Sequence, residues 1–199
     1  MTSSDLFPST LGTLSLPRQI PDGDLIALLK TFFCMVVFVE SIKYLSKFQI
    51  LSSTDARKIM HIGCGPIFLL CWPLYNSSDT ISGLLASMAP LSITFVFGLV
   101  GLGYIKDEST INSMSRSGKR QELLKGPLAY GLSISLITIL YWRNLSSLIP
   151  IICLCGGDGF ADIIGRRFGK GNTIPWSPRK SFAGSFGFIL GCSTLILSY

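Results

Sequence analysis

The stretch from Ile81 to Ile105 reads ISGLLASMAPLSITFVFGLVGLGYI and contains no charged residue. A helix that crosses a membrane needs roughly 20 consecutive apolar residues. These 25 positions meet that requirement without help from the rest of the chain. They predict one transmembrane helix. The presence of one such helix makes it more reasonable to interpret the shorter apolar segments of the chain as spans too.

Apolar segments with few charges lie on both sides of this stretch. Three of them are short, and each alone would suit a buried helix of a soluble protein. Only 14% of the 199 residues are charged, however, against roughly a quarter in soluble domains. We therefore expect an all-α polytopic membrane protein with about six transmembrane helices. The five further segments are Leu25–Leu45, Ile62–Tyr75, Pro127–Trp142, Leu145–Gly157 and Phe182–Tyr199.

The basic residues support this count. If six spans alternate in direction, 14 of the 17 Lys and Arg residues fall on one side of the membrane, as the positive-inside rule requires. The net charge of +6 is then explained by topology, and we expect no nucleic-acid partner. The 14 residues are Lys43, Lys47, Arg57, Lys58, Lys106, Arg116, Lys119, Arg120, Lys125, Arg166, Arg167, Lys170, Arg179 and Lys180.

The two ends of the chain differ in character. Residues 1–24 form a polar leader that we expect to lack fixed structure, and it has neither a secretory signal nor a convincing transit peptide. Residues 25–199 form the transmembrane domain. Its last apolar segment runs to Tyr199 without a polar flank, so we expect a domain that is incomplete at its C-terminal end. The six cysteines lie in apolar segments without metal or redox spacing, so we expect small buried hydrophobic residues.

The densest cluster of functional residue types lies between Gly156 and Gly184. Asp158 and Asp162 are four residues apart, so on a helix both carboxylates share one face. Two such carboxylates repel each other unless a cation lies between them, and Mg²⁺ is commonly held by one or two carboxylates together with phosphate oxygens. The alternative is that both residues merely end a span. We predict a magnesium site at Asp158 and Asp162.

Basic residues and glycines surround this pair. Gly157 and Gly159 would let backbone N–H groups approach a phosphate closely. Metal ligands, cations and glycines together are what phosphoryl transfer requires, although the cations also suit a plain topology signal. The spacing fits neither a P-loop nor a dinucleotide-binding motif. The predicted phosphate-binding cations are Arg166, Arg167, Lys170, Arg179 and Lys180.

Two other segments share the predicted side of the membrane. Arg57, Lys58 and His61 lie on one face of a helix that enters the membrane, and His61 could act as an acid or base or be a structural histidine. The loop from Ser113 to Pro127, which contains Lys125, could cover a nucleotide or be a solvated connection. We expect all three segments to contribute to one site.

Three sequence blocks resemble the polyprenol kinase family, most closely its plant phytol and farnesol kinases. The first is Arg57-Lys58-x-x-His61-Ile62-x-x-Gly65. The second runs from Glu122 to Tyr130. The third is Gly157-Asp158-Gly159-x-Ala161-Asp162-Ile163-x-Gly165-Arg166-x-Phe168-Gly169, followed by Arg179-Lys180-Ser181-x-Ala183-Gly184.

The resemblance implies a transmembrane kinase domain in a plastid membrane. Its reaction would be CTP-dependent phosphorylation of a membrane-dissolved isoprenoid alcohol, phytol or farnesol, as in phytol salvage for tocopherol synthesis. We expect Asp158, Asp162, Lys180 and His61 to be catalytic, with Mg²⁺ on the two carboxylates. The nucleotide would be bound by Gly157, Gly159, Arg166, Arg167, Lys170, Arg179 and Lys125.

Two other functions fit the same residues. A cytidylyltransferase of the CDP-diacylglycerol synthase type also joins an Asp-containing, glycine-rich turn to a basic segment. A transporter could use Asp158 and Asp162 as ligands of a coupling ion. We disfavour the transporter because the sequence predicts both carboxylates at the end of a span, whereas transporter sites lie near the membrane midplane.

Overall fold

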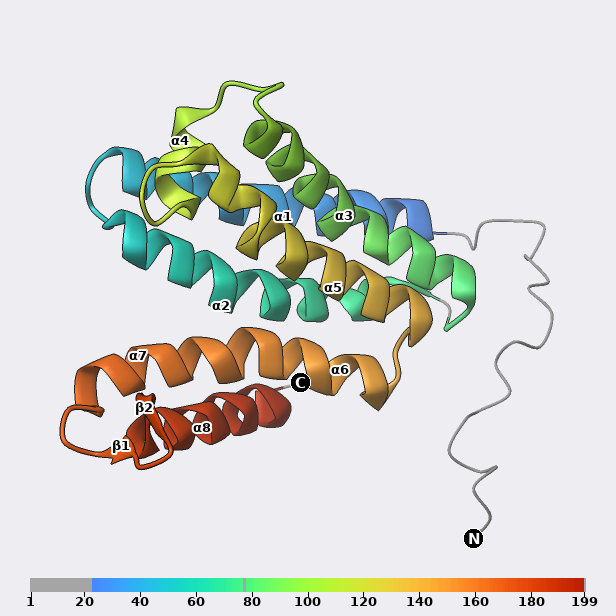
Figure 1. Ribbon diagram of the computed structural model, residues 1–199. Helices are drawn as coiled ribbons and strands as arrows, with labels where there is room; N and C mark the ends of the chain where they lie inside the picture. The colour runs from blue at the N-terminus through green and yellow to red at the C-terminus, as the bar shows by residue number, and fades with distance from the viewer. Residues whose placement is uncertain (1–22, 77, 199) are drawn as a thin grey trace, which may run out of the picture.

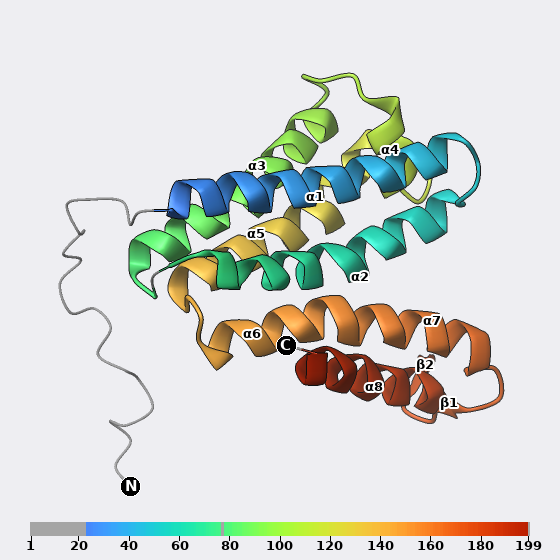
Figure 2. The same cartoon turned by 180° about the vertical axis from the view of Figure 1, so that it is seen from behind.

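The computed structural model describes residues 23–76 and 78–198 of the chain, except for the side chains of Arg179 and Ser198. Helices α1 (Asp24–Lys47), α2 (Ser53–Cys71), α3 (Thr80–Leu102) and α5 (Gly126–Leu140) form a bundle. A second layer, made of α6 (Leu145–Ile152), α7 (Asp158–Phe168) and α8 (Phe182–Ser198), lies beside α2 (Figure 1). The reverse view shows the same two layers (Figure 2).

Short elements connect these helices. They are η2 (Trp72–Leu74), α4 (Glu108–Met114), η3 (Arg120–Leu124), and the antiparallel strands β1 (Thr173–Ile174) and β2 (Ser177–Ser181). The α1–α2 turn, α4 and the strands all lie at one end of the molecule (Figure 1). The loops that carry the sorted basic residues therefore share one end, as the sequence predicted.

The class of fold is confirmed, since the described residues are mostly helical and their long helices are apolar enough for a membrane. The count of six spans is not confirmed. By length and composition, four described segments could cross a membrane: Asp24–Lys47, Thr80–Leu102, Arg120–Leu140 and Leu145–Phe168. Helix α8 is shorter than these, and α2 carries Asp55, Arg57, Lys58 and His61 in its first half.

The predicted end of the fifth span at Gly157 is wrong. The helix continues through a π-helical turn, η4 (Cys153–Gly157), into α7 and ends at Phe168. A π-helical turn inserts an extra residue into an α-helix and is frequent at functional sites. Asp158 consequently lies inside a long helix and not at its end, so its position does not disfavour a transporter.

The predicted leader of residues 1–24 lies outside the described residues except for Gly23 and Asp24, and Asp24 is already the first residue of α1 and is fully buried. Its carboxylate accepts hydrogen bonds from the backbone N–H of Asn76, at 2.8 Å, and from the Ser82 hydroxyl. A buried carboxylate is costly unless it is hydrogen-bonded. These bonds satisfy Asp24 and fasten the start of α1 to the start of α3.

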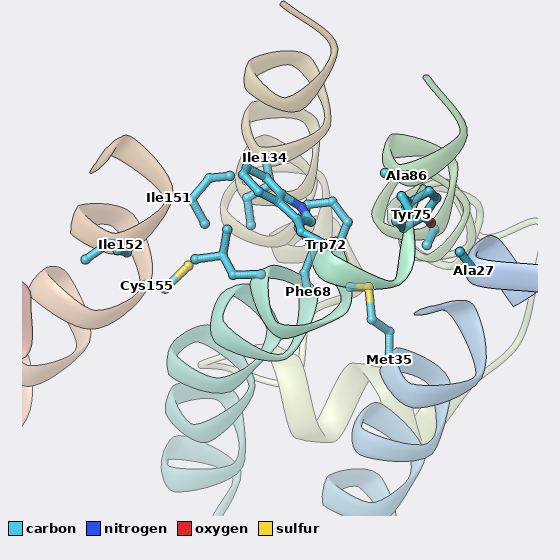
Figure 3. Packing of buried hydrophobic residues seen from close by; sticks show 12 residues of the cluster. Ala27, Met35, Phe68, Trp72, Tyr75, Ala86, Ile134, Ile151, Ile152 and Cys155 are labelled. Atoms are coloured by element: carbon cyan, nitrogen blue, oxygen red, sulfur yellow. The ribbon is translucent and has the colours of Figure 1, made fainter. Parts of the chain in front are cut away.

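Two buried clusters fill the bundle. One contains Val39, Met60, Phe97 and Met114 and lies toward the basic end. The other is built around Phe68 and Trp72 and extends to Met35, Ile134 and the α6 isoleucines (Figure 3). Many outward side chains, such as Phe95 and Leu136, are apolar and exposed, which suits contact with lipid. Cys34 is exposed as well, and three other cysteines are only partly buried, so the prediction of buried cysteines is confirmed at Cys71 and Cys155 and is wrong at Cys34.

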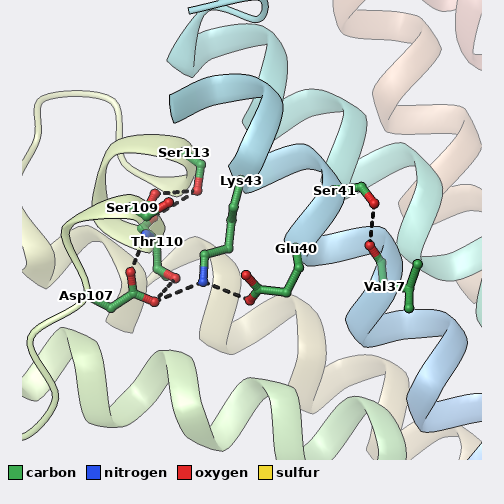
Figure 4. Close-up of polar contacts among 8 residues, drawn as sticks. All are labelled: Val37, Glu40, Ser41, Lys43, Asp107, Ser109, Thr110 and Ser113. Carbon is green, nitrogen blue, oxygen red and sulfur yellow. Dashed lines mark hydrogen bonds and ion pairs between the residues drawn. The ribbon is translucent and has the colours of Figure 1, made fainter. Parts of the chain in front are cut away.

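The connection between α3 and α5 is fastened to α1. Asp107 caps α4 by accepting a hydrogen bond from the Thr110 N–H at 2.9 Å, and its carboxylate is 3.0 Å from Lys43 Nζ on α1 (Figure 4). Lys43 also contacts Glu40 at 2.8 Å. The ion pair between α1 and the α4 cap therefore fixes where the following loop begins.

Candidate active site

A cavity of about 880 Å³ lies within the bundle, between the two buried clusters. Its walls come from α1, α2, α3, α5, α7 and the loop around η3. Binding sites for small molecules typically measure roughly 300–1,000 Å³. The cavity is thus large enough for a sizeable ligand. Charged side chains line one end of it and apolar side chains line the other.

The charged end of the cavity joins three segments that are far apart in the sequence. It carries cations from α2, from the η3 loop and from α7, together with carboxylates from the last two. All three blocks that resemble the polyprenol kinases meet here. The charged residues are Arg57, Lys58, Arg116, Lys125, Arg166, Glu122, Asp158 and Asp162.

His61 and Asp158 face each other across α2 and α7. His61 Nε2 is 3.3 Å from Asp158 Oδ2, and the Asp158 side chain is 71% exposed. Among the described residues, Nε2 has no hydrogen-bond partner despite its burial. The imidazole is held by Tyr130, whose hydroxyl donates to the His61 carbonyl at 2.6 Å and whose ring centroid is 4.5 Å away. A fixed His beside an exposed carboxylate is suited to proton transfer.

Asp162 has a different environment, although it lies one turn further along α7. Its carboxylate pairs with the Arg166 guanidinium and is 3.7 Å from Lys58 Nζ. Both Asp residues therefore border the cavity, but Asp162 already has cationic partners and Asp158 is the more open of the two. No group of three or more His, Cys, Asp or Glu side chains within the described part of the chain could hold a metal by itself.

The cations at this end crowd one another. Burial lowers the pKa of Arg57, and repulsion from Arg116 lowers it further. Arg116 is held in place by Glu122, which accepts hydrogen bonds from the Arg116 backbone N–H and the Ser117 hydroxyl. Crowded cations are stabilised when an anion binds between them. The charged end is therefore suited to a polyanion such as a triphosphate.

The predicted site residues divide into two groups. His61, Lys125, Asp158, Gly159, Asp162 and Arg166 line the cavity. Lys180, on β2, lies close enough to Asp158 to interact with it electrostatically. Like Lys180, three others lie outside the lining: Gly157, Arg167, whose guanidinium is 5.9 Å from the Phe168 ring, and Lys170 in the turn after α7. The side chain of Arg179 lies outside the described residues.

The structure gives the two predicted phosphate-binding glycines a packing role. A Cβ at Gly157 would lie 2.6 Å from the Phe188 ring on α8, and a Cβ at Gly159 would lie 2.1 Å from Ile62 on α2. Gly157 and Gly159 therefore allow α7 to approach its two neighbours closely. Sequence reasoning assigned them to phosphate because glycines serve both purposes equally well.

Four residues at the charged end were given no role from the sequence: Arg57, Lys58, Arg116 and Glu122. All four lie within or beside the three blocks that resemble the polyprenol kinases, so that resemblance could have identified them. Arg116 in particular is separated from Arg57 by two helices and a loop, and only the fold brings them to one cavity.

The fold and the cavity together define a helical membrane protein with an internal site that is charged at one end and apolar inside. No family model and no solved structure matches the chain. Curated proteins do match it. Chloroplastic farnesol kinase of Arabidopsis thaliana is 43% identical over 197 residues, which cover 93% of this chain and 62% of that protein.

Two further relatives agree with the first. A probable chloroplastic phytol kinase 3 of Glycine max is 42% identical over 81% of this chain and 58% of its own length. Chloroplastic phytol kinase 1 of Arabidopsis thaliana is 36% identical over 96% and 62%. The chain is a homologue of the plant phytol and farnesol kinases, as its motifs indicated. It spans about three fifths of the length of these relatives.

Proposed function

We propose that this chain forms the site at which a membrane-dissolved isoprenoid alcohol is phosphorylated by a nucleoside triphosphate, in a plastid membrane. The observation that carries the proposal is the two-ended cavity, because a donor and an acceptor of opposite polarity must meet there. The charged end suits the triphosphate, and the apolar interior suits an isoprenoid chain. The names of the relatives supply the alcohol class, phytol or farnesol.

The donor is proposed to be CTP, as the family resemblance implies, and the product would feed phytol salvage for tocopherol synthesis. Arg57, Arg116, Lys125 and Arg166 would neutralise the phosphates, since they surround the charged end from three sides. Lys180 would reach the same charge from the β2 strand. Neutralising and positioning the phosphates is the main contribution of the protein to phosphoryl transfer.

Mg²⁺ fits the two carboxylates of α7. Both border the cavity one helical turn apart, and Mg²⁺ characteristically takes only one or two protein carboxylates and completes its shell with phosphate oxygens and water. Bound by Asp158 and Asp162, the ion would neutralise charge that develops on the phosphates. Asp158 is the more open of the two, whereas Asp162 is already paired with Arg166 and Lys58.

The transfer would proceed at the His61 end of the cavity. The alcohol oxygen attacks the γ-phosphorus, and the bond from that phosphorus to the bridging oxygen breaks. The hydroxyl proton passes to the His61 imidazole, and Asp158, whose Oδ2 is 3.3 Å from His61 Nε2, stabilises the imidazolium that forms. The products are the isoprenyl monophosphate and the nucleoside diphosphate.

The experiment is to incubate membranes that contain this chain with labelled CTP and either farnesol, phytol or geranylgeraniol. Label from the γ-phosphate in the lipid extract supports the proposal. Label from the α-phosphate would instead identify a cytidylyltransferase, which transfers the nucleotidyl group and releases pyrophosphate. Flux of a solute without CTP consumption would favour the transporter.

A further inference from the structure

The apolar end of the cavity has a defined floor. Phe68 is fully buried, lines the cavity from α2 and belongs to the inner hydrophobic cluster. Its ring meets Trp72 edge to face, with centroids 5.9 Å apart. Figure 3 shows Phe68 next to Trp72, with Ile134 from α5 and Met35 from α1 nearby. Solid packing therefore closes the cavity at this point.

The wall between α3 and α5 is closed as well. Gly131 lies so near Thr94 that a Cβ at Gly131 would be only 1.7 Å from the Thr94 hydroxyl oxygen. Both residues line the cavity. Since the Gly131 backbone of α5 packs directly on the Thr94 side chain of α3, the wall between these two helices is closed at this contact.

The distance from the reacting end to the floor can be read along α2. His61 and Phe68 are seven residues apart on one helix, which corresponds to about 10 Å at 1.5 Å per residue. A C15 isoprenyl chain extended with the rise per bond of an extended polypeptide measures roughly 14 Å. A chain of C15 or longer that starts at His61 therefore reaches the floor and must bend against it.

We infer that Phe68 and Ile134 form the end of an isoprenoid-chain pocket and set which chain length the protein prefers. This inference rests on the proposed function for the identity of the ligand. It adds that specificity resides at the bottom of the cavity, far from the charged end. The last isoprene unit lies against these two side chains, so their size decides whether a C20 chain is accommodated as well as a C15 chain.

The test measures binding, so that it does not depend on transfer. The purified 199-residue chain in detergent micelles is titrated with tritiated farnesol (C15) and geranylgeraniol (C20), and the ratio of the two Kd values is compared among variants. Phe68→Leu puts a smaller side chain at the floor and deepens the pocket, so the Kd ratio should shift about tenfold in favour of C20. Ile134→Phe puts a larger side chain there and should shift the ratio about tenfold toward C15. Either variant alone is informative if the other does not fold.

Ile152→Val is the matched control. Ile152 belongs to the same buried cluster but does not line the cavity, so it should leave the ratio unchanged. A ratio that stays constant in the folded floor variants, or a wild-type chain that binds neither alcohol, would overturn the inference. Binding without phosphorylation would instead contradict the proposed function and leave the pocket in place.

Discussion

His61 Nε2 on α2 lies 3.3 Å from Asp158 Oδ2 on α7, and this contact joins the two layers of the molecule at the charged end of the cavity. The two residues are almost 100 positions apart in the sequence. Neither residue is explained by packing alone, since the carboxylate is open and Nε2 lacks a hydrogen bond among the described residues. The pair is therefore the centre of our account of the chemistry.

Replacing His61 should impair transfer without disturbing the fold. His61→Gln keeps a polar side chain of similar length but removes the base, and loss of a general base typically costs roughly 10²–10⁴-fold in rate. We expect kcat with farnesol to fall within that range while the thermal unfolding temperature stays the same. Asp158→Ala should abolish transfer and leave membrane insertion intact. Full activity in either variant would remove the proposed role of the pair.

The cations of the η3 loop should act on the nucleotide. Arg116→Ala and Lys125→Ala each remove one charge from the charged end, and charge-assisted hydrogen bonds contribute about 1.5–3 kcal/mol. We therefore expect KM for CTP to rise roughly tenfold to a hundredfold, with little change in KM for the alcohol. Lys47→Ala, at the same end but outside this cavity, serves as the control. Equal effects of all three substitutions would indicate a general loss of surface charge and not a specific site.

The contact between α2 and α7 should depend on Gly159. A Cβ there would be 2.1 Å from Ile62, and overpacking of this kind costs about 1–3 kcal/mol. We expect Gly159→Ala to lower the thermal unfolding temperature and Ile62→Ala in the same chain to restore part of the loss. Gly126→Ala, which meets nothing within 4 Å, should not destabilise the protein. If Gly159→Ala is as stable as the wild type, the close approach of the two helices is incorrect.

The cap of α4 should make stability depend on pH. Burial acts to raise the pKa of Asp107, but hydrogen bonds from Thr110 and Lys43 outweigh it and leave the pKa below its ordinary value of 3.8. A carboxylate with a lowered pKa stabilises the fold above its ordinary pKa, and the contribution is lost as the pH falls through the folded value. Asp107→Ala should therefore cost about 1 kcal/mol at pH 6 and progressively less as the pH falls below 3.8.

That pH dependence is measured by following thermal unfolding in detergent from pH 6 downward, in the wild type and in Asp107→Ala. The two curves should converge at the acidic end. A constant difference between them at every pH would show that the carboxylate charge of Asp107 does not contribute.

The sequence predicted the class of fold and much of the cavity's charged end. Apolar runs marked six segments that are helical over most of their described length, and the sorting of Lys and Arg placed their loops at one end. His61, Asp158 and Asp162 were proposed to share a site because of their residue types and spacing, and the fold does bring them together.

The course of the helix beyond Gly157 could not be predicted, because glycines and charges normally end a span. In the structure the same glycines let α7 lie close to α2 and α8, and those contacts keep the helix intact to Phe168. The apolar interior was also invisible from the sequence. Phe68 and Ile134 are separated by 66 positions, and in a chain rich in apolar residues nothing distinguishes a cavity wall from a lipid-facing surface.

The central claim is that the isoprenoid alcohol lies inside the bundle, beneath the charged end. Its most direct test is photocrosslinking with a farnesol analogue that carries a diazirine at the tail, followed by mass-spectrometric mapping of the adducts. We predict adducts on α2 and α5 at or beside Phe68 and Ile134, and their loss when unlabelled farnesol is in excess. Adducts confined to outward-facing residues such as Phe95 and Leu136, insensitive to competition, would contradict the account.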